Sequence, residues 1–77
     1  MQMATTMGKN DLEFLCVKHL YDKGVLTQSE YAAYIETPPG SAAGDTWFQA
    51  NVTELMLDEI AEWITPAQLT QAKAIIP

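Results

Sequence analysis

The sequence lacks arginine altogether, and its four lysines leave a long central stretch without positive charge. From Val25 to Ala72 there are seven carboxylates and no Lys, Arg or His. These are Glu30, Glu36, Asp45, Glu54, Asp58, Glu59 and Glu62. A chain of net charge −6 repels the negatively charged phosphate backbone of a nucleic acid. Nucleic-acid binding also needs clustered Lys and Arg, which this chain lacks. The charge therefore favours a protein partner with a basic surface over direct binding of nucleic acid.

Cysteine and long apolar runs are also scarce. Cys16 is the one cysteine among 77 residues, so no internal disulfide can form, and a free thiol fits a reducing cytoplasm. No group of His, Cys and carboxylates has the spacing of a metal site, and we predict neither metal nor cofactor. No apolar run approaches the roughly 20 residues that span a bilayer. A chain this short buries a small core, so oligomerisation is a reasonable source of added stability.

Capping patterns predict where helices begin. The capping pairs are Asn10 with Glu13, Thr27 with Glu30, Thr46 with Gln49, and Thr65 with Gln68, the last with Pro66 at the first helical position. The expected helices are residues 11–23, 28–36, 46–64 and 66–75. Between the second and third, a loop is expected at 37–45 because it contains Pro38, Pro39 and two glycines. The prediction is an all-α, four-helix domain at residues 10–77, preceded by a flexible N-terminus at 1–9.

The segment that joins the first two predicted helices has a recognisable pattern. Gly24, Thr27, Glu30 and Tyr31 match the second half of a calcium-binding EF-hand loop. The preceding ligand positions would be His19, Tyr21 and Lys23, none of which is a carboxylate, so calcium binding is not expected. A glycine stop followed by a capping box explains the same residues as a helical hairpin.

This hairpin, from about Leu15 to Tyr31, resembles the short helical hairpin called the SHOCT domain. The shared pattern is a leucine-rich helix, Gly24, two aliphatic residues, Thr27, then Glu30 and an aromatic residue. The resemblance implies a role in oligomerisation or docking rather than in catalysis. The family usually has basic residues in its second helix, and Ala32, Ala33 and Tyr34 replace them here.

The predicted helix at 46–64 is apolar around more than half of its circumference. Its apolar positions are Phe48, Ala50, Val52, Leu55, Met56, Leu57, Ile60, Ala61, Trp63 and Ile64. Three short companion helices can hardly cover such a helix, so a homodimer is expected, with Leu57, Ala61 and Ile64 at the interface. The alternative is that this helix is the central helix of a monomer.

The polar side of the same predicted helix carries Glu54, Asp58 and Glu62 at successive i, i+4 steps. Like charges at this spacing repel one another, and no cation lies within reach along the helix. We therefore predict that these three carboxylates bind a partner. Trp47 projects from the same side and is either an interface anchor or packed under the loop at Pro38 and Pro39.

Catalysis is not expected. Cys16 and His19 lie one helical turn apart and could form a nucleophilic pair, but no set of oxyanion donors accompanies them, and a buried structural pair is the preferred interpretation. The resulting hypothesis is a small acidic cytoplasmic protein that regulates or inhibits a larger host protein, by analogy with the small proteins of phages and bacteria. The alternative is a structural subunit that acts by self-association.

Overall fold

The computed structural model describes residues 8–77, and every regular element among them is a helix. The elements are α1 (Lys9–Asp22), α2 (Gln28–Ile35), α3 (Ala42–Asn51), α4 (Glu54–Glu59), a short 3-10 helix η1 (Ala61–Trp63) and α5 (Pro66–Ile75). The all-α prediction is thus confirmed. The predicted flexible segment at 1–9 falls mostly outside the described residues, and its last residue, Lys9, belongs to α1.

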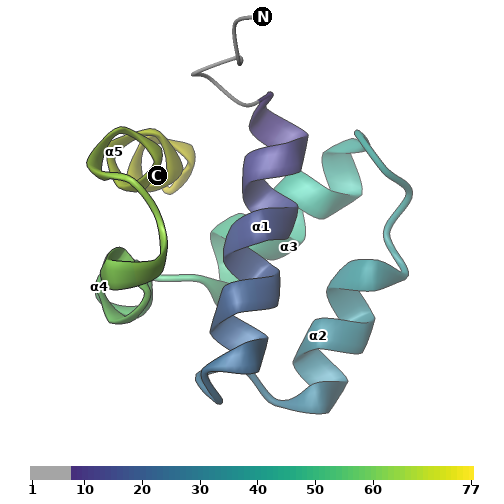
Figure 1. Cartoon of the computed structure of the whole chain (residues 1–77). Helices are drawn as coiled ribbons and strands as arrows, with labels where there is room; N and C mark the ends of the chain where they lie inside the picture. Colours follow the sequence, from purple (N-terminus) through teal and green to yellow (C-terminus); the bar gives the residue numbers. More distant parts are fainter. Residues whose placement is uncertain (1–7) are drawn as a thin grey trace, which may run out of the picture.

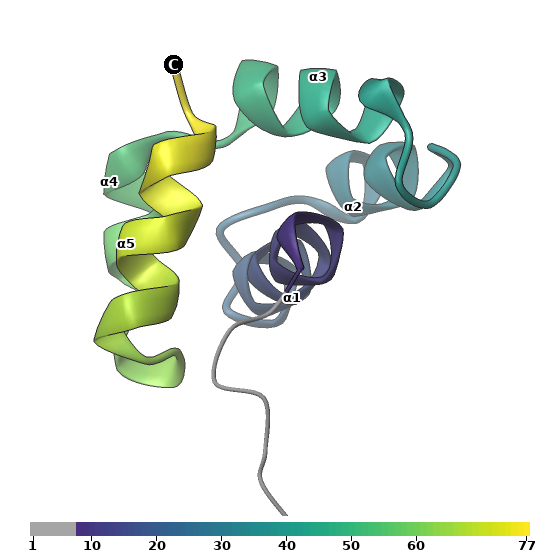
Figure 2. The same ribbon diagram turned by 90° about the horizontal axis from the view of Figure 1, so that it is seen from above.

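The central element is α1, which contacts α2, α3, α4 and α5. Figure 1 shows α2 on one side of α1, the pair α4 and α5 on the other, and α3 crossing behind it. Figure 2 shows the same arrangement from above, with α4 and α5 side by side. The buried core is formed by Leu12, Cys16, Val17, Leu20, Leu26, Tyr34, Phe48, Val52, Leu57, Ile60, Ile64 and Ala72.

The turn between α1 and α2 follows the predicted pattern. Gly24 has a φ of +86°, its N–H donates to Tyr21 O, and the N–H of Val25 donates to Leu20 O. These two bonds form a Schellman motif, which satisfies the last carbonyls of α1. Thr27 then opens α2 with a complete capping box to Glu30. The predicted cap at Thr65 and Gln68 is likewise present at the start of α5.

We expect Gly24→Val to lower the free energy of unfolding by about 1–2 kcal/mol, because a β-branched residue is strained at positive φ. A Cβ at this position would meet no atom within 4 Å, so backbone strain alone is responsible. Urea denaturation monitored by circular dichroism measures the effect. Gly24→Asn is the matched control and should cost less, because Asn tolerates the left-handed conformation. Equal stability of the Val variant would contradict the assigned backbone geometry.

Two predicted helix starts are wrong. The Asn10 and Glu13 capping box does not form, because α1 begins at Lys9 after Gly8 and the Glu13 side chain is buried. α3 begins at Ala42 rather than at Thr46, with the Ser41 hydroxyl accepting the N–H of Gly44. Gly44 is tolerated inside the helix because α3 packs closely there: a Cβ would lie 3.2 Å from Thr37 Oγ1.

The predicted long helix at 46–64 is also wrong, because the chain leaves the helical conformation at Val52 and Thr53. Both residues are extended, with ψ angles of 129° and 164°. The Thr53 hydroxyl caps α4 by accepting the N–H of Met56 at 3.2 Å. The break turns the chain so that Val52, on one side of it, and Leu57, on the other, both enter the core. The predicted single helix is therefore the second half of α3 together with α4 and η1, and both α3 and α4 pack against α1.

Candidate functional site

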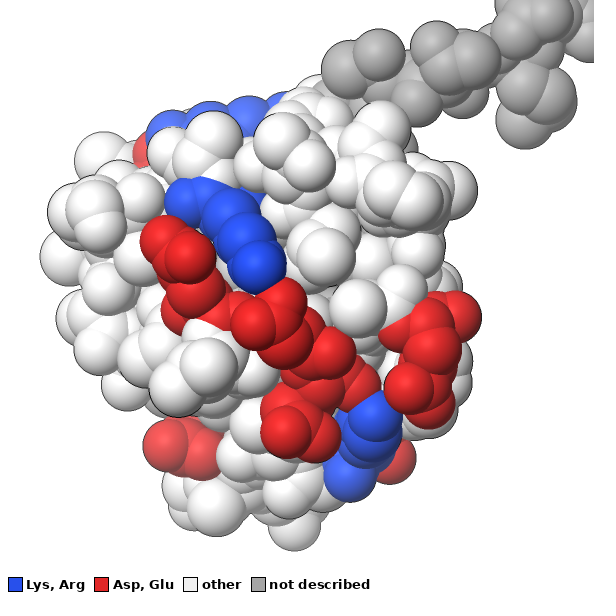
Figure 3. Space-filling view, turned by 90° about the vertical axis from the view of Figure 1, so that its left-hand side faces the viewer, with Lys and Arg blue, Asp and Glu red and all other residues white. Residues whose placement is uncertain are grey.

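The predicted acidic residues Glu54, Asp58 and Glu62 belong to α4 and η1, on the face of the molecule that carries α4 and α5. Figure 3 shows acidic side chains gathered in a diagonal band across this face, with lysine side chains lying against it. Asp58 is in α4 and Glu62 in η1, so the two carboxylates are not on one continuous helix. The bend at Ile60 separates them.

Lysines from other elements neutralise part of this band. Lys73 of α5 lies 2.7 Å from Asp58 Oδ1, and Lys23 lies 3.6 Å from Glu62 Oε2. Lys23 also donates to the carbonyl of Glu59 and lies over the Trp63 ring at 5.5 Å. As expected, no cation lies within reach along the same helix, but lysines of other elements reach these carboxylates in the folded chain. Asp58 thus forms an ion pair between α4 and α5, and Glu62 forms one between η1 and the residue that ends α1.

Two carboxylates on α4 remain without an ion pair among the described residues, namely Glu54 and Glu59. Between them lies Leu55, whose side chain is 78% exposed and is the most exposed large apolar residue of the described chain. Leu55 and Glu59 are four residues apart on the same helix and share one face. Sequence reasoning placed Leu55 on the apolar face and missed its exposure, because that reasoning assumed a continuous helix.

The residues predicted for a dimer interface have different environments. Leu57 is completely buried and Ile64 is 9% exposed, both within the core of this chain, whereas Ala61 is exposed. The assignment of Leu57 and Ile64 to a dimer interface is corrected accordingly, because both side chains are buried in the core of this chain. Self-association itself stays a prediction.

Trp47 is half-buried and packs on Tyr34, with ring centroids 5.3 Å apart. It thus contacts α2 of its own chain, and it is on a different helix from Glu54 and Asp58, because the break at Val52 ends α3. This packing favours the structural interpretation of Trp47 over that of an interface anchor.

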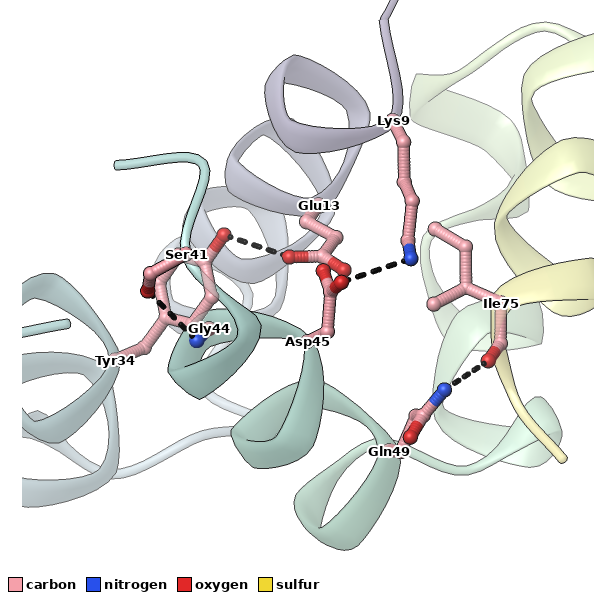
Figure 4. A network of polar contacts seen from close by, with 8 residues as sticks. All are labelled: Lys9, Glu13, Tyr34, Ser41, Gly44, Asp45, Gln49 and Ile75. Carbon is pink, nitrogen blue, oxygen red and sulfur yellow. Dashed lines mark hydrogen bonds and ion pairs between the residues drawn. The ribbon is translucent and has the colours of Figure 1, made fainter. Parts of the chain in front are cut away.

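A second polar cluster lies where α1, α2 and α3 meet (Figure 4). Glu13 is 1% exposed, and its Oε1 accepts the Tyr34 hydroxyl at 3.3 Å. Asp45 of α3 faces Glu13, and the Asp45 Oδ2 binds Lys9 Nζ at 2.9 Å. Two oxygens, Glu13 Oε2 and Asp45 Oδ1, are buried and have no hydrogen-bond partner among the described residues. A proton on Glu13 would allow it to donate to Asp45. Sequence reasoning assigned Glu13 to a helix cap and so missed this cluster.

The two carboxyls have opposite pKa shifts. Burial, followed by the hydrogen bond with Asp45 and the negative charge of Asp45, raises the pKa of Glu13 to about 7. The hydrogen bond from Glu13, followed by that from Lys9, holds the pKa of Asp45 below its usual range. These directions make Glu13 the acid that keeps a proton below about pH 7 and Asp45 the ionised acceptor.

Cys16 and His19 do not form a nucleophilic pair. The Cys16 thiol is completely buried, and burial, followed by the charge of Glu13, raises its pKa to about 11. Such a thiol stays protonated at neutral pH. The His19 ring contacts the edge of Trp63, with centroids 5.5 Å apart.

Within residues 8–77 there is no cluster of three or more His, Cys, Asp or Glu side chains that could hold a metal ion. In the same part of the chain, none of the helices has the length and apolarity needed to cross a membrane. Comparison with protein families, curated proteins and solved structures gave no match. The resemblance of the α1–α2 hairpin to the SHOCT domain stays a prediction.

Proposed function

We propose that this protein acts by binding a larger protein through the outer face of α4, as a small non-catalytic regulator or inhibitor. The observation that carries the proposal is Leu55, 78% exposed between the unpaired carboxylates Glu54 and Glu59. An exposed apolar side chain within a charged rim is the arrangement of a protein-binding surface. Because the rim is acidic and the whole chain carries a net charge of −6, the complementary partner surface is basic.

The ion pairs reduce the number of predicted carboxylates that are available to a partner. Asp58 and Glu62 are engaged with Lys73 and Lys23, so replacing these two by Lys would place cations together and disturb the fold. Glu54 and Glu59 are the better candidates for partner contacts. Direct binding of nucleic acid and of membranes is not part of the proposal, and the cytoplasm is the proposed location because Cys16 is a free thiol. A phage-type origin stays an analogy.

We expect the double variant Glu54→Gln/Glu59→Gln to weaken partner binding about tenfold, because two charge-assisted contacts with a basic surface are lost. The measurement is affinity capture from a lysate of the cells that encode the protein, with elution by rising salt. The partner bound by the wild type should elute at moderate salt, since exposed charge pairs are screened.

The matched control is Asp22→Asn/Glu36→Gln, which removes the same net charge from other exposed positions. This control should retain the partner as the wild type does. Equal capture of the partner by the wild type and both double variants would contradict the proposal that the outer face of α4 binds it. Recovery of the chain alone, without a foreign protein, would instead favour the structural subunit that acts by self-association.

A further inference from the structure

A cleft of about 360 Å³ lies on the other side of α1 from α4 and α5, between the first half of α1, the end of α2 and the loop to α3. Its size is within the range of ligand-binding clefts. The lining residues are Asn10, Asp11, Glu13, Phe14, Tyr34, Ile35, Thr37, Pro38, Pro39, Gly40, Ser41 and Gly44. The proposed function uses none of these residues.

The walls of the cleft are apolar and partly exposed. Phe14 is 44% exposed and Ile35 is 46% exposed, and these are two of the four large apolar side chains exposed in the described chain. Pro38 and Pro39 complete the wall with backbone φ angles fixed by their rings. An apolar hollow with rigid walls can hold a side chain without much reorganisation.

The exposed charged group of the cleft is a carboxylate. Asp11 is exposed and lines the cleft beside the buried acid Glu13, and no Lys or Arg lines it. The nearest lysine in sequence, Lys9, is bound to Asp45 on the side of Glu13 away from Tyr34 and Ser41 (Figure 4). An aliphatic chain that ends in a cation therefore matches both parts of the cleft.

We propose that this cleft binds a lysine or arginine side chain in an extended segment of a partner protein, with the aliphatic stem against Phe14 and Ile35 and the cation at Asp11. A second copy of this chain is a poor occupant, because its four lysines are all engaged in ion pairs within the described residues. The inference does not depend on the face of α4.

The probe is a lysine tripeptide, N-acetyl-Leu-Lys-Leu-amide, titrated into isotope-labelled protein and followed by NMR. Its matched control contains norleucine in place of lysine, so that the stem is kept and the ammonium is lost. We expect millimolar binding, with shifts confined to residues of the cleft and affinity three- to tenfold higher for the lysine peptide. Phe14→Ala should weaken both peptides about tenfold.

Asp11→Asn should remove the preference for lysine, whereas Asp22→Asn, at the other end of α1, should keep it. Equal affinity for the two peptides would overturn the assignment of a cation. An absence of shifts at millimolar peptide would overturn the cleft as a binding site. Shifts of the cleft residues that depend on protein concentration would instead identify a second copy as the occupant. The variants Glu54→Gln/Glu59→Gln leave the cleft unchanged, so this test and that of the α4 face fail independently.

Discussion

Leu57→Glu is expected to unfold this domain rather than to separate a dimer. Leu57 is completely buried among core residues that include Val52 and Ile60. The substitution removes an apolar side chain and buries a carboxylate without a partner, for an expected cost of at least about 4 kcal/mol. A domain of this size has a small core and little stability in reserve. Circular dichroism and urea denaturation should therefore show a largely unfolded chain.

Leu55→Glu is the matched control, because it makes the same change two residues away at a side chain that is 78% exposed. Its free energy of unfolding should stay within about 0.5 kcal/mol of the wild type. Sedimentation at micromolar concentration adds the oligomeric state. A dimeric wild type together with a folded, monomeric Leu57→Glu variant would contradict the buried position and restore Leu57 to an interface.

Local signals in the sequence predicted the parts of the fold that depend on local chemistry. The turn at Gly24 and the caps at Thr27 and Thr65 form as expected, because each is fixed by bonds between residues at most five positions apart. The break at Val52 and Thr53 was not predicted, since Thr53 lacks a Glu or Gln three residues later. Its cause is tertiary: an uninterrupted helix would not bury both Val52 and Leu57 against α1.

The candidate sites were less predictable for a related reason. Lys23 and Glu62 are 39 positions apart, and Lys73 and Asp58 are 15 apart, so neither ion pair can be recognised from helical spacing. Glu13 is an extreme case: its position near the start of a helix indicates a cap, and only the packing of α3 over α1 makes it a buried acid. Carboxylates that have no cation nearby in the sequence thus form ion pairs between elements of the folded chain.

Glu13 should make the stability of the domain fall as pH rises from about 5 to 7. The folded state raises the pKa of Glu13 from 4.5 to about 7, so the folded chain holds a proton that the unfolded chain has lost. Stability from this proton is fully present below the unfolded pKa and is lost as pH rises through the folded pKa. Asp45 is ionised in both states across this interval, because its pKa is lowered. We expect a loss of about 1–2 kcal/mol, below the full linkage value because the surroundings of a buried carboxylate relax when it ionises.

Glu13→Gln is the variant that tests this linkage. Its amide can accept the Tyr34 hydroxyl and donate to Asp45 Oδ1, as the neutral acid does, but it has no proton to lose. Urea denaturation at pH 5 should give similar stability for both proteins, whereas at pH 8 the variant should be more stable by about 1–2 kcal/mol. Glu36→Gln, at an exposed position, should follow the wild type at every pH.

Glu13→Ala should be less stable than the wild type at pH 5, because it leaves a cavity and an unsatisfied Asp45 oxygen. A wild type whose stability is flat or rises between pH 5 and 8 would show that Glu13 is ionised throughout and that Lys9 compensates both carboxylates.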